Sequence, residues 1–308
     1  MSSTRRVTIA AGTLLLFSFV GSVLLLRQVD HLRTNATIEQ VLFISSPRAL
    51  KRMSLGYDGL LADIYWTRAV QYFGTAHHST GHYELLYPLL NIATVLDPHL
   101  VPAYEFGANF VGPKPPNGAG QPEKAIALTE FGIRNNLNEW RLYYNLGFIH
   151  YTEMKNYSAA ADAFARGSKV PGAHPFLRIL AAQMAQHAGE SDTARMLWTT
   201  TYQASQDPSI RANAVAHLRA LRVDDEVTKL ESTISLYRQK TGRSPSNFAE
   251  LARAGLIGGV PLDPLGRPYN LTADGKLEVR SPDDLPFIQK GMPAGYVPPK
   301  RPKLLPSD

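Results

Sequence analysis

The chain of 308 residues contains no cysteine, which excludes disulfide bonds, thiolate metal sites, cysteine nucleophiles and lipid attachment at a cysteine. Charged residues make up 19% of the chain and hydrophobic residues 44%, a balance that excludes a wholly disordered protein. The net charge of +6 is too small to indicate nucleic-acid binding by itself. Catalytic signatures are missing too, since there is no nucleophile elbow, phosphate loop, metalloprotease helix motif or dinucleotide fingerprint. We therefore expect no catalytic residue, no cofactor and no nucleic-acid partner.

One long apolar run lies near the amino terminus. It begins at Val7 and ends at Leu26, and these twenty uncharged residues would span about 30 Å as a helix. No small-x-small cleavage site follows, which favours an uncleaved single-pass anchor; a cleaved signal peptide and a buried core helix are the alternatives. Arg5 and Arg6 precede the run and Arg27 follows it, so the positive-inside comparison is nearly even. Because a short basic tail usually stays cytoplasmic, we expect a bacterial inner-membrane protein with most of its chain in the periplasm.

Residues 49–222 have the apolar spacing of helices, arranged in pairs with short polar breaks. In the best-formed pair, Leu146-Gly147 is followed by Tyr157, Ala160 and Phe164. This order resembles the tetratricopeptide repeat, a two-helix unit of about 34 residues, except for one extra residue before Tyr157. The resemblance implies an α-solenoid of stacked helix pairs whose concave surface binds peptides or protein partners.

Two further features of this region agree with such stacking. Asp97-Pro98 and Asp207-Pro208 match the ending of the repeat, because a proline ends a helix at the preceding residue. Small residues such as Gly107 and Gly147 would let neighbouring helices approach closely, while aromatic side chains fill the remaining space. His150 and His217 lie on helical faces among apolar residues and are expected to be packed, hydrogen-bonded core groups.

We expect a partner to contact side chains on the concave helices. Asp63 is one such candidate, but it could instead pair with Arg68 and orient a neighbouring ring; a structural ion pair, a peptide-binding anchor and a catalytic acid are the three interpretations. The predicted protein-binding residues are Tyr104, Arg141, Tyr144, Asn145, Asp63 and Trp66.

Residues 223–284 have a different sequence pattern, with single helices and short strands in place of helix pairs. A helix is expected at 224–240 and a short one at 247–254 closed by Gly255, and Asp274-Gly275 predicts a hairpin turn. The region resembles the globular end of type II secretion major pseudopilins, although Leu265 replaces the family's tryptophan and neither the calcium loop nor the pilin start is present. The resemblance implies a small α+β shape only. The matching residues are Tyr237, Gly242, Pro245, Asp263, Pro264, Gly266, Pro268 and Tyr269.

Three segments leave alternatives open. His77, His78 and His82 form a histidine cluster that is either a polar loop or a metal site. Residues 111–122 are rich in proline and glycine and form either a surface insertion or a functional protrusion or lid. Residues 285–308 read as a proline-rich basic tail, with a docking peptide or a phospholipid contact as the alternative.

Taken together, these patterns predict a mainly α protein, with a tetratricopeptide-like α-solenoid, an amino-terminal transmembrane helix and a small α+β module. The expected function is a membrane-anchored scaffold or adaptor for protein partners, in an envelope assembly such as a secretion or type IV pilus-like system. One alternative is a metal-binding or enzymatic envelope protein that uses the histidine cluster, and another is a soluble chaperone-like factor. The predicted domains are a cytoplasmic tail (1–6), a transmembrane helix (7–26), a linker (27–48), a helical repeat domain (49–222), a pseudopilin-like module (223–284) and a tail (285–308).

Overall fold

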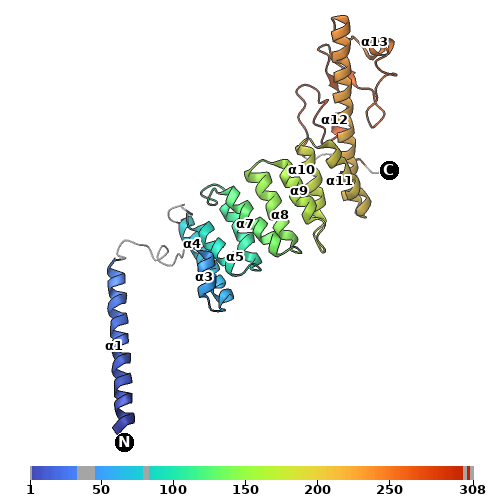
Figure 1. Ribbon diagram of the computed structural model, residues 1–308. Coiled ribbons are helices and arrows are strands. Elements are labelled where there is room, and N and C mark those ends of the chain that lie inside the picture. The colour runs from blue at the N-terminus through green and yellow to red at the C-terminus, as the bar shows by residue number, and fades with distance from the viewer. Residues whose placement is uncertain (1, 33–45, 79–82, 301–303, 306–308) are drawn as a thin grey trace.

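The computed structural model describes residues 2–32, 46–78, 83–300 and 304–305 (Figure 1). The protein is mainly helical and contains one two-stranded sheet within this described part. The fold therefore agrees with the expected helical class and its small strand content.

The first helix, α1 (Ser2–Leu32), contains the whole apolar run and stands apart from the helical body in Figure 1. Its described side chains include exposed Leu14, Leu15 and Phe17, at 77%, 72% and 79%. Within the described part of the chain, no helix combines the length and the apolarity that crossing a membrane requires. The side chains of residues 7–11 and 26 of the predicted span lie outside the described residues.

The predicted linker at 27–48 begins and ends differently in the structure. Helix α1 continues to Leu32, and α3 (Pro47–Met53) begins two residues before the expected boundary at 49. Ser46 caps α3, since its side chain accepts a hydrogen bond from the backbone N–H of Ala49, and Pro47 occupies the first turn. Residues 33–45 lie outside the described part of the chain.

The middle of the chain forms four successive helix pairs, α4 with α5, α6 with α7, α8 with α9 and α10 with α11, and each pair also contacts the next. Figure 1 shows them side by side in chain order. Local signals set their limits: Asp97 ends α5 before Pro98, and Asn156 caps α9. The helices are α4 (Asp58–His78), α5 (Leu86–Leu96), α6 (Val101–Val111), α7 (Pro122–Asn135), α8 (Trp140–Phe148), α9 (Tyr157–Gly167), α10 (Phe176–His187) and α11 (Ser191–Ala204).

Glycines allow the helices of a pair to approach closely, as the sequence predicts. An ideal Cβ on Gly147 of α8 would lie 2.6 Å from Cδ1 of Phe164 on α9. A Cβ on Gly132 of α7 would lie 2.8 Å from Cγ of Tyr104 on α6. Since such distances are too short for real Cβ atoms, each glycine opens the space that an aromatic ring then fills.

The extra residue between Gly147 and Tyr157 coincides with a change of helix type. After Phe148 the α8 helix widens into a π-helical turn, η1 (Ile149–Glu153), and Lys155 then takes a positive φ of 52°. A π-helical turn accommodates one additional residue without breaking the helix, and such turns are frequent at functional sites. The departure from repeat spacing is therefore a structural feature of this helix.

The helix expected at 224–240 begins earlier, at Pro208, and so crosses the predicted domain boundary at 222/223. One helix of 34 residues, α12 (Pro208–Thr241), runs across it. Asp207 caps its start, and Gly242, with a φ of +76°, ends it. No glycine or proline interrupts residues 209–241, so nothing in the local sequence stops the helix. Its first half packs on α11 through residues such as Leu221, and its second half forms the core of the carboxyl-terminal module through residues such as Ile234.

That module contains the short helix and the hairpin expected from the sequence. Helix α13 (Phe248–Arg253) is capped by the side chain of Asn247. Strands β1 (Asn270–Leu271) and β2 (Leu277–Glu278) pair antiparallel, with Asn270 opposite Glu278 and Leu271 opposite Leu277. Gly275 has the positive φ of 83° that the turn requires. A 3₁₀ turn, η2 (Pro282–Asp284), follows.

The segment predicted to begin the tail is packed instead. Residues 285–291, which we call the strap, bury Leu285 and Ile288 to 1% and 8% exposure. The backbone N–H of Val279 donates to the carbonyl of Gly291 at 2.7 Å. The apolar side chains of this segment lie in the same core as α12, so the proposed start of the tail at 285 is corrected.

Candidate functional site

Tyr104 lies in the core, so its prediction as a contact residue is wrong. Its side chain has 0% exposure, and its hydroxyl donates to the carbonyl of Pro98 at 3.1 Å. The ring lies over Gly132, and burial raises the pKa of its hydroxyl well above the ordinary value. Tyr104 therefore joins α6 to α7 and offers no surface to a partner.

The three other residues expected on the inner helices lie together on α8. The guanidinium of Arg141 is exposed, bonds Glu139 at 3.1 Å and lies 5.0 Å from the centre of the Trp140 ring. Tyr144 and Asn145 are half-buried on the same helix. These side chains are available to a partner that approaches this face.

Asp63 and Trp66 lie apart from that group, on α4. Trp66 is half-buried and meets Phe106 of α6 edge to face, with ring centres 5.2 Å apart. Asp63 is exposed. Both Asp63 and Arg68 belong to the described part of the chain, and they form no ion pair with each other. The interpretation of a structural Asp63–Arg68 pair is therefore wrong, because side chains five positions apart on a helix point to different sides.

The histidine cluster is described only at His77. Its Nδ1 lies 3.2 Å from the hydroxyl of Tyr83 and 3.1 Å from the carbonyl of Pro116, and its ring stacks on Phe73. The side chain of His78 and the whole of His82 lie outside the described residues. Among the described residues, no group of three His, Asp or Glu side chains could hold a metal ion.

The loop at 111–122 is packed at the same corner. The hydroxyl of Tyr83 donates to the carbonyl of Pro116 at 2.6 Å, and the N–H of Ala119 donates to the carbonyl of Phe110 at 2.9 Å. These bonds attach the loop to the end of α6 and to Tyr83, just before α5. Its position therefore depends on contacts with both the first and the second helix pair.

A row of aromatic side chains runs along α8, the π turn and the start of α9. Neighbouring ring centres along this row lie 6.4, 4.7, 6.2 and 6.0 Å apart. All five residues are half-buried, so each ring packs on the helices and also presents a surface. We call this set the aromatic row: Trp140, Tyr144, Phe148, Tyr151 and Tyr157.

Phe148 and Tyr151 of the aromatic row line a pocket of about 480 Å³. Four parts of the chain line it: the α8–π–α9 region, α10, α12 and residues 287–289 of the strap. Its walls include three glutamines and two histidines, and none of its lining residues is Asp, Glu, Lys or Arg. We call this cavity the junction pocket, because it lies where the helix pairs meet the carboxyl-terminal module.

His217 of α12 forms one wall of the junction pocket. Its ring is sandwiched between Trp198 and Phe287, with centre distances of 4.1 and 3.9 Å and interplanar angles of 10° and 3°. Burial lowers the pKa of His217 to about 3, so the imidazole is neutral at ordinary pH. The expectation of a packed, hydrogen-bonded core histidine is confirmed for His217. His150 is half-buried, and its Nδ1 has no hydrogen-bond partner among the described residues.

The hydrogen bonds of Gln186 define which nitrogen of His217 carries the proton. Nδ1 of His217 lies 2.7 Å from Oε1 of Gln186, and Nε2 of Gln186 donates to the carbonyl of Phe287 at 3.3 Å. Because the amide nitrogen faces a carbonyl, the amide oxygen must accept from Nδ1–H. Nε2 of His217 is then a buried acceptor without a partner among the described residues.

The strap holds its part of the pocket wall in a strained conformation. Phe287 has a φ of +73°, which for a residue of this kind costs of order 1–3 kcal/mol. Asp224 of α12 is 9% exposed, and its Oδ1 accepts the backbone N–H groups of Gln289 and Lys290, both at 2.8 Å. Burial raises the pKa of Asp224, and these two bonds oppose that shift. Sequence reasoning missed the strap; its only sequence signal is the apolar content of residues 285–288.

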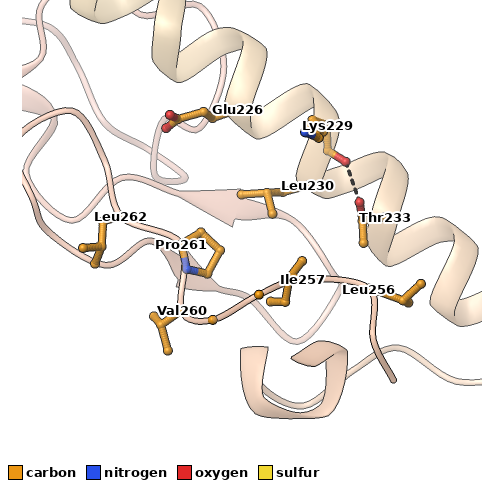
Figure 2. Close-up of a pocket in the computed structure, with 11 residues that line it drawn as sticks. Glu226, Lys229, Leu230, Thr233, Leu256, Ile257, Val260, Pro261 and Leu262 are labelled. Carbon is orange, nitrogen blue, oxygen red and sulfur yellow. Dashed lines mark hydrogen bonds between the residues drawn. The ribbon is translucent and has the colours of Figure 1, made fainter. Parts of the chain in front are cut away.

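A second cavity, of about 500 Å³, lies between α12 and residues 256–262 (Figure 2). Leu230 of α12 and Pro261 of the facing segment project into the space between them in Figure 2. Its one carboxylate, Glu226, already accepts from the hydroxyl of Tyr269 and from Nε of Arg222, each at 2.8 Å. The cavity is therefore a groove of mixed character, in which Lys229 and Thr233 accompany the aliphatic side chains and the acidic group is engaged within the fold.

Comparison with known proteins adds no family to these observations. No protein-family model matches the chain, and no curated protein matches it significantly. The resemblances to tetratricopeptide repeats and to pseudopilins therefore stay predictions.

Proposed function

We propose that this protein is a membrane-tethered adaptor whose helix pairs form a tetratricopeptide-like solenoid and bind a polypeptide partner. The observation that carries the proposal is the aromatic row leading into the junction pocket. Half-buried aromatic side chains supply large contact area at little entropic cost, and they are enriched where proteins bind one another. Arg141 and Asn145, on the same helix, would supply polar contacts beside the rings.

The buried ionisable groups near this surface favour binding over catalysis. His217 is neutral and held by Gln186, and Asp224 accepts two backbone N–H groups of the strap. A general acid or base needs a free proton-transfer position beside a reacting group. Each of these two groups instead joins parts of the fold.

Two segments near the amino terminus support the proposed membrane tether. Helix α1 exposes apolar side chains along its described length. At the other end of the predicted linker, α3 exposes Arg48 and Arg52, and the turn before α4 exposes Leu55 and Tyr57, at 87% and 67%. Basic and apolar side chains together suit the surface of an anionic membrane. We place the helical body on the periplasmic side, in an envelope assembly such as a secretion or type IV pilus-like system.

Crosslinking in intact membranes tests the adaptor function. Triple replacement of Arg141, Tyr144 and Asn145 by alanine should abolish recovery of the partner that the wild-type chain captures, with helicity unchanged. Arg134→Ala is the matched control, because its exposed side chain on α7 pairs with Glu130 at 3.8 Å, lies over the ring of Phe131 and is not part of the aromatic row. Undiminished capture by the triple variant would contradict the proposal.

Membrane flotation tests the tether separately. The full chain should float with vesicles, whereas a chain that lacks residues 1–32 should stay in the soluble fraction. If the full chain is recovered only in the soluble fraction, the tether is wrong, while adaptor binding through α8 would be unaffected.

A further inference from the structure

We infer that the junction pocket binds an uncharged aromatic side chain of the partner polypeptide, together with its flanking peptide groups. This inference rests on the proposed adaptor function and names the chemistry that the adaptor recognises. A volume of about 480 Å³ lies within the range of about 300–1,000 Å³ typical of ligand sites. The pocket also continues from the aromatic row, so an extended chain lying on α8 would reach it.

The lack of charged side chains in the pocket favours an uncharged occupant. Its lining includes no acidic residue, lysine or arginine. His217 is neutral, and the nearby carboxylate of Asp224 is already bonded to the strap. A charged group entering the pocket would therefore lose its hydration without meeting an opposite charge, which is strongly unfavourable.

The aromatic walls favour an aromatic occupant over an aliphatic one. Phe148 and Tyr151 stand on one side, and Phe287 of the strap on another. Tyr151 belongs to the π turn, so the extra residue in that helix sets the direction of this ring. Ring pairs gain energy from offset or edge-to-face contacts beyond the area they bury.

One unused polar side chain on the pocket wall fits a peptide group beside such a side chain. Gln183 of α10 is half-buried on the pocket wall, and its side-chain amide forms no hydrogen bond with any described residue. Its amide can both donate and accept, as one peptide group requires. Nε2 of His217 also lacks a described partner, but it is buried behind the stacked rings of Trp198 and Phe287 and is not offered to the peptide.

The pocket wall is fixed before any partner arrives. Phe287 keeps its positive φ because its ring stacks on His217 and its carbonyl accepts from Gln186. The next residues are held by Asp224. A preformed wall lowers the ordering cost of binding, so a short peptide is sufficient to test the site.

The test is a calorimetric titration of the full chain in nanodiscs with capped pentapeptides. The probes are acetyl-Gln-Ala-X-Ala-Gln-amide, where X is phenylalanine, alanine, aspartate or lysine. The phenylalanine peptide should bind at least about tenfold more tightly than the other three, because only it places a ring in the pocket without a charge. Equal affinity for all four peptides, or no binding of the phenylalanine peptide, would overturn the inference.

Variants at the pocket mouth locate the binding site. Gln183→Arg should weaken the phenylalanine peptide at least about tenfold, while Gln203→Arg on α11, which is exposed and outside the pocket, should leave its affinity unchanged. If Gln183→Arg loses helicity, Gln183→Glu replaces it with the same expected loss. Unchanged affinity in a folded Gln183 variant places the peptide elsewhere and rejects the site.

The same variants separate this inference from the adaptor function. Membrane capture that is lost in the α8 triple variant but kept in Gln183→Arg would leave the adaptor function standing and reject the pocket. Peptide binding at the pocket combined with undiminished capture by the α8 triple variant would reject the adaptor surface and keep the pocket.

Discussion

At the scale of single residues, His217 couples stability to pH. Its pKa in the folded chain is about 3, against about 6.5 for an unperturbed histidine. The unfolded chain therefore takes up a proton as the pH falls below about 6.5, whereas the folded chain does so only near pH 3. The stabilisation is complete above the higher value and is lost progressively as the pH falls between the two.

We therefore predict that the free energy of unfolding falls by about 1.4 kcal/mol per pH unit from this group alone between about pH 6 and pH 3.5. His217→Phe should reduce the slope by that amount, because the ring stack is kept and the titrating group is removed. Urea unfolding at several pH values, followed by the fluorescence of the stacked Trp198, measures both slopes. Identical slopes in the two proteins would contradict this origin of the pH dependence.

A second prediction at this scale concerns the effect of Gly147 on stability. An alanine there would place its Cβ against Phe164, which is fully buried and has little room to move. Gly147→Ala should destabilise the chain by about 1–3 kcal/mol, as overpacked cores do. Gly74→Ala on α4 is the control: its Cβ would meet nothing within 4 Å, and we expect a gain of up to about 1 kcal/mol from helix propensity. Thermal unfolding compares the two, and equal effects would show that close approach at Gly147 is unimportant.

At the scale of elements, the strap depends on one carboxylate. Asp224→Ala removes the acceptor of two backbone N–H groups and should cost about 1–3 kcal/mol. Amide exchange at Gln289 and Lys290 should then accelerate, while exchange in α8 stays as in the wild type. The neighbouring Asp225→Ala removes an exposed pair with Arg195 and should cost less than about 1 kcal/mol. Slow exchange of the strap amides in Asp224→Ala would mean that other contacts hold this segment.

The elements that could be predicted from sequence are those with local causes. Asp97-Pro98 ends α5, Asn247 caps α13, and Asp274-Gly275 makes the hairpin turn; each signal acts within a few residues. The strap could not be predicted, because Phe287 is held by side chains about 70 and 100 positions earlier in the chain. The composition of the last 24 residues indicated only a tail.

The candidate site divides in the same way. Arg141, Tyr144 and Asn145 were predicted as contact residues, and they lie together because they are close in sequence on one helix. Tyr104 was misplaced because the side of α6 that is buried depends on how α6 packs on α7, where Gly132 makes room for its ring. The junction pocket is lined by residues from four separate segments, so no local sequence pattern predicts it.

At the scale of the whole molecule, α12 joins the helix pairs to the carboxyl-terminal module. Leu221 belongs to the core of the helix pairs and Val223 to that of the module, only two residues further on. The strap adds a second connection, since Gln186 of α10 bonds Phe287 and Gln289. Because both connections must break for the parts to separate, we expect the helix pairs near α11 and the module to unfold together.

Arg222→Pro tests this coupling at the middle of α12. Proline removes a helical hydrogen bond and clashes with the preceding turn, at a cost of about 3 kcal/mol or more. We predict that calorimetry of the full chain shows the module and the last helix pair melting in one transition, and that Arg222→Pro separates them into two. Arg222→Ala is the matched control, because it removes only an exposed pair with Glu226 and should keep the single transition. A single transition in Arg222→Pro would mean that the strap alone couples the two parts, and Asp224→Ala in that background should then divide them.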